Sequence, residues 1–363
     1  MTDLKPIRVG IVGCGAFSEL FYAPLLSSFQ DDGQVEVVSL FDPDEKRLGE
    51  LAKKFPKAVC SPDISVVKSA GIDFAIVASP PRFHAEQTIS LLNEGVAVLC
   101  EKPMAATVAE AEEMIAAAKQ TNTLLAVGLF RRFFATTQLV KEIVFNERLG
   151  KVKEFKVFEG GIFNWPAQSA SFFQKSGSNG GVLADLGVHV LDVLIYWFGM
   201  PTSFRYEDDA MGGLEANSFI ELEFENDIKG TVRLSRDTNL PNRTIIECEQ
   251  GWLRCGAASA DQLEIGFPGS ELSVAGEIKN IGKNGPDSYR SRSAASFSMA
   301  FAEQLRNVLA AVRKDGELLI DGEQGVLSMR LIEQCYSSRN LMSMPWLGQS
   351  EMSSTEKFFA KSV

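Results

Sequence analysis

Histidine is scarce in this chain of 363 residues, which contains two, His84 and His189. Zinc sites are built mainly from clustered His and Cys ligands, so this scarcity predicts that no metal is bound. The six cysteines include no C-x-x-C pair, which indicates reduced and mostly buried thiols rather than a redox centre or a disulfide framework. The chemistry of this protein is therefore expected to come from other groups.

Long apolar runs and an excess of positive charge are also missing. No run reaches membrane length, and the polar residues 1–5 show no charged-then-apolar pattern of a signal peptide. The formal net charge is −11, which argues against the broad basic face that binds nucleic acid or anionic lipid. We therefore expect a cytoplasmic protein whose partner is a small molecule, with neither nucleic acid nor a membrane involved.

What is present is an ordinary globular composition, with 45% hydrophobic and 23% charged residues. The length suits about two domains, and the rhythm of the sequence changes near residue 130. Before it, short apolar runs alternate with segments of helical spacing, which predicts parallel βαβ units. The expected strands are residues 7–12, 35–41, 73–79, 96–100 and 123–128.

After residue 130 the apolar residues follow a period of two, which is typical of a sheet with one exposed face. Ile220, Leu222 and Phe224 alternate with glutamates, and Asn226-Asp227 supplies a tight turn before the alternation resumes. Further strands are expected at 151–160, 243–249 and 252–255, a loop at 276–293, and helices at 297–313 and 324–339.

These patterns together predict an α/β protein of two domains. Residues 1–130 form an N-terminal Rossmann domain with a doubly wound parallel sheet that binds NAD(P). Residues 131–363 form a C-terminal α+β domain with a large, mostly antiparallel, open-faced sheet. Residues 344–363 are polar enough to form a C-terminal arm.

The first predicted strand runs into Gly13-Cys14-Gly15, a turn that opens a helix. Gly13 permits the sharp turn, and Gly15 lets a pyrophosphate approach the free N–H groups at the helix N-terminus. This is the setting of a dinucleotide fingerprint, although Ser18 stands where a third glycine or an alanine is usual. We expect the cofactor to bind this turn and the two residues after it, Ala16 and Phe17.

Asp42 ends the second predicted strand, where a carboxylate can accept hydrogen bonds from the adenosine ribose hydroxyls. The same charge would repel the 2′-phosphate of NADP, so NAD is favoured as the cofactor. Lys46 and Arg47 follow closely enough to reach such a phosphate, so NADP stays open.

A second signal lies in residues 182–198, which are apolar almost all round and predict a buried helix. The polar exceptions recur at helical spacing on one face: Asp185, His189, Asp192 and Tyr196. Buried polar groups need partners, so this stripe faces either an internal hydrogen-bond network or a cleft. A histidine one turn after a carboxylate is also what removal of an alcohol proton requires.

Taken in order, these motifs resemble the glucose–fructose oxidoreductase/inositol dehydrogenase family (Gfo/Idh/MocA) over most of the chain. The segments that carry the resemblance are residues 10–15, 78–84, Glu101-Lys102-Pro103, Arg131-Arg132-Phe133, and Gly180-Gly181 with Asp185, His189 and Asp192. The resemblance implies an NAD(P)-dependent dehydrogenase that transfers hydride between nicotinamide and a secondary alcohol or ketone of a sugar, cyclitol or sugar derivative. It also implies that the C-terminal domain 131–363 serves substrate binding and oligomerisation, with a homodimer or homotetramer paired through the exposed face of the antiparallel sheet.

The resemblance further implies a role for individual residues. His189 takes the hydroxyl proton, Asp185 orients His189, and Lys102 hydrogen-bonds the reacting oxygen. The Lys102-Pro103 bond is expected to be cis. Further cofactor-binding residues are expected where two predicted strands end, and the substrate is expected to contact the three catalytic residues and Trp165. The added cofactor residues are Ser79, Pro80, His84, Glu101 and Lys102.

For three segments a structural role competes with a functional one. Packing in the helix after residues 73–79 is favoured for His84, and Arg131 and Arg132 are expected to form a solvated or interdomain pair. Residues 163–166 either stack on a sugar or form a packed loop. Two other functions also stay open. One is a glycosidase that oxidises C3 transiently with NAD, and the other is a non-catalytic dinucleotide or sugar sensor, which usually lacks the lysine or histidine present here.

Overall fold

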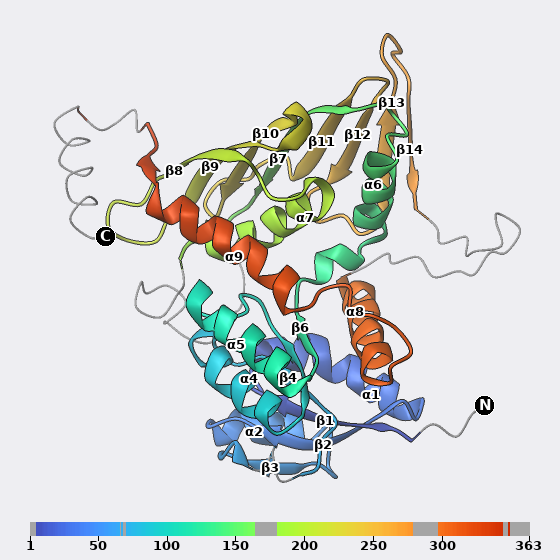
Figure 1. The fold of residues 1–363 in the computed structure, drawn as a ribbon, viewed down its shortest axis with the longest axis vertical. Coiled ribbons are helices and arrows are strands. Elements are labelled where there is room, and N and C mark those ends of the chain that lie inside the picture. The colour runs from blue at the N-terminus through green and yellow to red at the C-terminus, as the bar shows by residue number, and fades with distance from the viewer. Residues whose placement is uncertain are drawn as a thin grey trace, which may run out of the picture. The chain divides into compact units, whose positions relative to one another are not determined.

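The computed structural model describes residues 5–65, 67, 70–163, 180–278, 297–343 and 348. The chain divides into two compact units, which are coloured along the chain in Figure 1. The first contains Met1–Phe130 and Phe301–Met329, and the second contains Arg131–Ala300 and Arg330–Val363. The sequence predicts a single break after residue 130, so the return of Phe301–Met329 to the first unit corrects the predicted domain 131–363.

The first unit is built on a parallel sheet of six strands in the order β3-β2-β1-β4-β5-β6. The strands are β1 (Ile7–Val12), β2 (Val35–Phe41), β3 (Val59–Ser61), β4 (Phe74–Val77), β5 (Ala97–Cys100) and β6 (Leu125–Val127). This is the doubly wound Rossmann order, in which ligands bind beyond the carboxyl ends of the strands. The five predicted strands are confirmed. The sixth strand, β3, was not predicted because its three residues are exposed or half-buried and do not form a continuous apolar run.

The helices of this unit begin where side chains satisfy the first backbone N–H groups. Asp44 accepts from the amides of Lys46 and Arg47, and Thr107 forms a reciprocal capping box with Glu110. The helical segments are a π-helical turn η1 (Ser18–Tyr22), α1 (Ala23–Asp31), α2 (Glu45–Ala52), η2 (Pro81–Phe83), α4 (His84–Asn93), α5 (Val108–Thr121) and most of α8 (Phe297–Val312).

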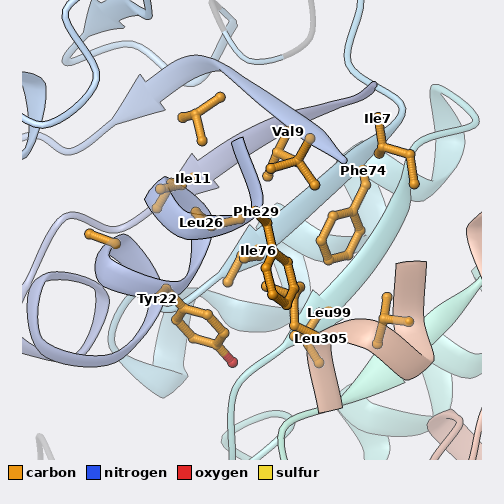
Figure 2. Close-up of a cluster of buried hydrophobic side chains, with 14 of the residues drawn as sticks. Ile7, Val9, Ile11, Tyr22, Leu26, Phe29, Phe74, Ile76, Leu99 and Leu305 are labelled. Atoms are coloured by element: carbon orange, nitrogen blue, oxygen red, sulfur yellow. The ribbon is translucent and has the colours of Figure 1, made fainter. Parts of the chain in front are cut away.

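Figure 2 shows the core between the strands of this sheet and its neighbouring helices. Ile11, Ile76 and Leu99 come from three adjacent strands and are fully buried, as is Leu305 of α8. The amphipathic face of α8 therefore completes the first core. This burial is the physical reason why Phe301–Met329 belongs to the first unit.

The second unit contains a nine-stranded sheet in the order β14-β13-β12-β11-β7-β10-β9-β8-β15. Neighbouring strands are antiparallel except for the parallel pairs β7–β10 and β8–β15, which confirms a mostly antiparallel sheet. The strands are β7 (Val152–Gly160), β8 (Ser203–Asp208), β9 (Asn217–Glu223), β10 (Lys229–Ser235), β11 (Arg243–Cys248), β12 (Trp252–Gly256), β13 (Gln262–Gly266), β14 (Ser273–Glu277) and β15 (Asn340–Leu341).

The predicted hairpin is confirmed, because β9 and β10 pair antiparallel around a turn in which Asn226 and Asp227 both have φ of 59°. The remaining helical segments are η3 (Phe130–Phe133), α6 (Ala135–Phe145), η5 (Leu183–Gly187), α7 (Val188–Phe198), η6 (Glu225–Asp227) and α9 (Gly322–Ser337). The predicted helix 182–198 is thus present, with its first turn wound as the π-helical turn η5.

Two predicted segments lie largely outside the described residues. Strand β14 occupies the start of the expected loop 276–293, and residues 279–296 are not described. Of the expected C-terminal arm 344–363, only Gly348 is described. No helix among the described residues has the length and apolar character needed to cross a membrane.

Candidate active site

The turn Gly13-Cys14-Gly15 is packed tightly on one side. Gly13 has φ of 95°, and a Cβ atom there would lie 2.6 Å from the backbone nitrogen of Ser79, at the end of β4. Ser18 is fully buried and donates a hydrogen bond from its hydroxyl to the Gly13 carbonyl at 2.5 Å. The serine in the third fingerprint position therefore ties the following helix to the turn.

The other side of the turn is open. A Cβ atom on Gly15 would meet no heavy atom of the described residues within 4 Å, so the backbone beside the helix start is accessible. Asp42 is buried at the end of β2, where its carboxylate accepts the Cys14 amide at 2.8 Å and the Asp44 amide at 2.9 Å. A carboxylate with two such bonds keeps lone pairs for ribose hydroxyls. An open helix N-terminus beside a fixed carboxylate fits a dinucleotide.

His84 joins the loops that follow β4 and β5. Its imidazole is buried, with Nε2 2.7 Å from the Ser79 carbonyl and Nδ1 2.9 Å from the Pro103 carbonyl. The Ser79 hydroxyl in turn donates to the side-chain oxygen of Gln87 at 2.6 Å, and Pro80 is exposed. Burial lowers the pKa of His84. The favoured packing role is thus observed, and the packing holds the loop that carries Lys102.

Lys102 is half-buried directly after β5, and the Lys102-Pro103 bond is cis, as predicted. Its neighbour Glu101 is buried and points into the unit. The Glu101 carboxylate accepts the Tyr22 hydroxyl on Oε1 and the Lys102 amide on Oε2 at 3.1 Å. Burial raises the pKa of Glu101 to about 7, against the opposing effects of Tyr22 and Lys102. Sequence reasoning missed Tyr22, because a tyrosine on a buried helical face has no distinguishing signal.

In the second unit, Asp185 lies in η5 and forms an ion pair with Arg236, which follows β10. Both side chains are about one quarter exposed, at 26% and 28%. The Arg236 guanidinium also lies over the Phe163 ring, 5.5 Å from its centroid. Arg236 was not predicted, since only the tertiary fold brings this strand end to the helix. The other residues of the expected aromatic segment, including Trp165, lie outside the described residues.

The stripe residue Asp192 and the two neighbouring arginines form buried ion pairs. Asp192 is fully buried and accepts Arg132 through both Nε (3.0 Å) and Nη2 (2.6 Å). Arg131 makes a bidentate pair with Glu159 at 2.8 Å on both sides. The expected solvated or interdomain arginine pair is therefore wrong: both arginines are buried, and each is neutralised within the second unit, as buried charges must be.

His189 lies one turn after Asp185, in the first turn of α7, and is 5% exposed. Beside it is a cavity of about 30 Å³, also lined by Arg131, Thr136 and Thr244. A space of this size holds a water molecule and is too small for a sugar.

The start of this helix is anchored by Glu215, which the sequence did not single out. Its buried carboxylate accepts the Gly181 and Leu183 amides at 3.0 Å and the Tyr336 hydroxyl at 2.6 Å. A Cβ atom on Gly180 would lie 2.1 Å from the Tyr336 hydroxyl, so the glycine pair allows this close approach. Burial raises the pKa of Glu215.

The predicted site residues thus form one group on each unit. The first group surrounds the carboxyl ends of β1, β2, β4 and β5, and it holds the turn with Ala16 and Phe17, Asp42, Ser79, Pro80, His84, Glu101 and Lys102. The second group holds Asp185 and His189, with Arg236 added. The described residues contain no cluster of three His, Cys, Asp or Glu able to hold a metal.

Comparison with known families matches both units. The model described as an oxidoreductase family with an NAD-binding Rossmann fold covers residues 7–129, and the GFO/IDH/MocA C-terminal domain covers residues 137–254. The chain belongs to the GFO/IDH/MocA family. As a member, it is an oxidoreductase whose first unit contains an NAD-binding Rossmann domain.

Among similar proteins is D-glucoside 3-dehydrogenase of Escherichia coli K12, 32% identical over 60% of this chain and 59% of that enzyme. Another is scyllo-inositol 2-dehydrogenase (NADP(+)) IolW of Bacillus subtilis 168, 24% identical over 92% of this chain and 93% of its own length. The solved structure of levoglucosan dehydrogenase with NADH and levoglucosan superimposes with a TM-score of 0.80 over 92% of this chain and 97% of that one. At 17% identity this last likeness shows the shared fold.

Proposed function

We propose that this oxidoreductase transfers hydride between NAD and a secondary alcohol or ketone of a sugar, cyclitol or sugar derivative. The observation that carries the proposal is that a member of this family has both Lys102 and the Asp185/His189 pair. Lys102 lies two residues beyond the end of β5, and His189 follows Asp185 by one helical turn. The relatives named as glucoside and inositol dehydrogenases support the substrate class.

The cofactor would be held by the open side of the Gly13–Gly15 turn and by Asp42. When bound, NAD supplies the hydride acceptor or donor of the reaction. The buried Asp42 disfavours a 2′-phosphate, and Arg47 lies 3.5 Å from the Asp44 carboxylate, so its charge is already balanced. NAD is therefore proposed over NADP. His84 and Glu101 contribute by shaping the two loops, since their polar atoms are bound to protein groups.

In the reaction, His189 takes the proton of the substrate hydroxyl as general base, and Asp185 orients His189. Lys102 donates a hydrogen bond to the same oxygen and stabilises the negative charge that develops on it. The ion pair with Arg236 fixes the Asp185 carboxylate. Substrate contact by Trp165, and a homodimer or homotetramer formed through the open face of the nine-stranded sheet, belong to the same proposal.

The experiment that tests this function is a screen of sugars, cyclitols and sugar derivatives with NAD and with NADP, followed by the absorbance of the reduced cofactor. We expect turnover with at least one secondary alcohol, faster with NAD, and its loss in Lys102→Met. Glycoside cleavage without net cofactor reduction would replace the proposal by the NAD-dependent glycosidase. Ligand binding without turnover of any compound would replace it by the sensor.

A further inference from the structure

Tyr22 is a buried polar residue to which the proposed reaction assigns no task. It ends the π-helical turn η1 and is fully buried in the core shown in Figure 2. Its ring also lies near the rings of Phe17 and Phe301, with centroids 5.8 and 6.1 Å away. Its hydroxyl donates to Oε1 of Glu101, and the Gln304 amide lies 3.4 Å from the same hydroxyl. π-Helical turns add a residue to a helix and are frequent at functional sites. Here the turn brings a phenol to the end of β5.

The Glu101 carboxylate is buried and held at both of its oxygens. Oε1 accepts Tyr22, and Oε2 accepts the backbone amide of Lys102 at 3.1 Å. Gly128 forms the wall, since a Cβ atom there would lie 2.7 Å from Oε1. A carboxylate confined in this way has little freedom to rotate, so it transmits the position of the Tyr22 hydroxyl to the Lys102 peptide.

The same loop is held at its other end. Beyond Lys102, the Pro103 carbonyl lies 2.9 Å from the buried His84 ring. Lys102 is therefore clamped between Glu101 at its own amide and His84 at the carbonyl of the next residue. A long, flexible lysine side chain gains precision when its backbone is fixed on both sides, because fewer torsions remain to be ordered in the reaction.

The charges around Glu101 agree with this arrangement. The titratable groups that face it are Tyr22 from η1, Cys100 from β5 and Lys102 from its own loop. Burial raises the pKa values of the Tyr22 phenol and the Cys100 thiol, so both stay neutral at ordinary pH. The Tyr22 hydrogen bond and the nearby Lys102 each lower the pKa of Glu101, which burial raises to about 7.

We infer that Tyr22 is a positioning residue of the reaction, which acts through the Glu101 carboxylate to fix the peptide that carries Lys102. The inference rests on the proposed function, since it requires Lys102 to act on the substrate oxygen. It predicts that loss of one buried hydroxyl lowers the rate through Lys102 and changes the pH dependence, with binding of NAD and substrate little affected.

The test is Tyr22→Phe in the full-length enzyme, with Tyr206→Phe as the control for loss of a buried phenol hydroxyl in the second unit. We expect Tyr22→Phe to lower kcat by roughly tenfold, the effect of one hydrogen bond to a charged group, with both KM values nearly unchanged. The acid limb of the kcat profile should move to higher pH, because the carboxylate has lost a donor. Glu101→Gln should give a similar loss of kcat and remove the part of the acid limb that this carboxylate contributes, which leaves the part that comes from the general base His189. Tyr206→Phe should keep the kcat and the profile of the native enzyme.

A double-mutant cycle separates this inference from the proposed function. If Tyr22 acts through Lys102, adding Tyr22→Phe to Lys102→Met causes no further loss of kcat. A second, independent tenfold loss would overturn the inference. So would a Tyr22→Phe enzyme with a lower melting temperature but unchanged kcat and pH profile, which would show a merely structural role. Near-native kcat in Lys102→Met alone would reject the proposed function itself.

Discussion

In each unit of this protein, a buried glutamate accepts a tyrosine hydroxyl and also binds the backbone near the residues proposed to act on the substrate. In the first unit Glu101 accepts Tyr22 and one backbone amide, that of Lys102. In the second, Glu215 accepts Tyr336 and two amides at the start of the helix that carries Asp185. The same pair, a buried glutamate that accepts a tyrosine hydroxyl, therefore fixes a single loop peptide in one unit and the start of a helix in the other.

The surroundings of the two glutamates differ as well. Lys102 stabilises the ionised form of Glu101, whereas Asp208 faces Glu215 and, like burial, raises its pKa. Removal of the Glu101 carboxylate should mainly disturb the placement of Lys102, and thus the rate. Removal of the Glu215 carboxylate should mainly destabilise the second unit. Backbone groups that lose a buried acceptor carry the full desolvation cost.

The largest effect on kcat should come from Lys102 and His189, the two residues proposed to act on the substrate. Lys102→Met and His189→Asn should each lower kcat by roughly 10²–10⁴-fold, the usual contribution of one proton-transfer or charge-stabilising group. Binding of NADH, followed by its fluorescence, should be retained in both variants. If one variant kept native turnover, the two units would not contribute equally to the reaction and the comparison would fail.

The next effect concerns the anchored helix. Glu215→Ala removes the acceptor of the Gly181 and Leu183 amides, so we expect the free energy of unfolding to fall by about 2–4 kcal/mol. Chemical denaturation followed by tryptophan fluorescence measures this loss, since Trp197 belongs to α7. Glu101→Ala in the first unit serves as the matched variant and should cost less, because one amide rather than two loses its acceptor. The reverse order would contradict the distinction between a held loop and a held helix.

A third prediction concerns pH. The pKa of Glu101 in the folded protein, about 7, lies above the ordinary value of 4.5, so the folded state keeps its proton longer than the unfolded state. The stability due to this protonation is complete below pH 4.5 and is lost as the pH rises to 7. The free energy of unfolding of the native enzyme, followed by thermal unfolding, should therefore fall relative to that of Glu101→Gln as the pH rises through this window, by at most about 1.4 kcal/mol per pH unit. Parallel curves for the two proteins would disprove the assignment.

The smallest effect should follow from Tyr336→Phe, which removes one of the three donors to Glu215 and leaves both helix amides bound. We expect a loss of about 1 kcal/mol in the free energy of unfolding. The pH profile of kcat should stay that of the native enzyme, in contrast to Tyr22→Phe. A profile shifted by Tyr336→Phe would show that both tyrosines act on the reaction.

Much of the fold could be predicted from the sequence because its signals are local. Strands buried on both faces appear as continuous apolar runs, and the β9–β10 hairpin appears as strict alternation around Asn226-Asp227. The short strand β3 and the assignment of α8 could not be predicted in this way. An amphipathic helix shows that it has an apolar face, but not which core that face will join.

The residues of the candidate site divide along the same line. The sequence alone determined the glycine turn, Asp42 and the Asp185/His189 spacing, since these depend on neighbours a few positions apart. The cis Lys102-Pro103 bond was expected from the family resemblance and is present. Only the tertiary structure decided that Arg131 and Arg132 are buried and form ion pairs with Glu159 and Asp192. It also decided that Arg236 binds Asp185, and that Glu101 and Glu215 accept the hydroxyls of Tyr22 and Tyr336. Each of these contacts joins residues far apart in the chain, and the burial that makes them necessary exists only after the chain has folded.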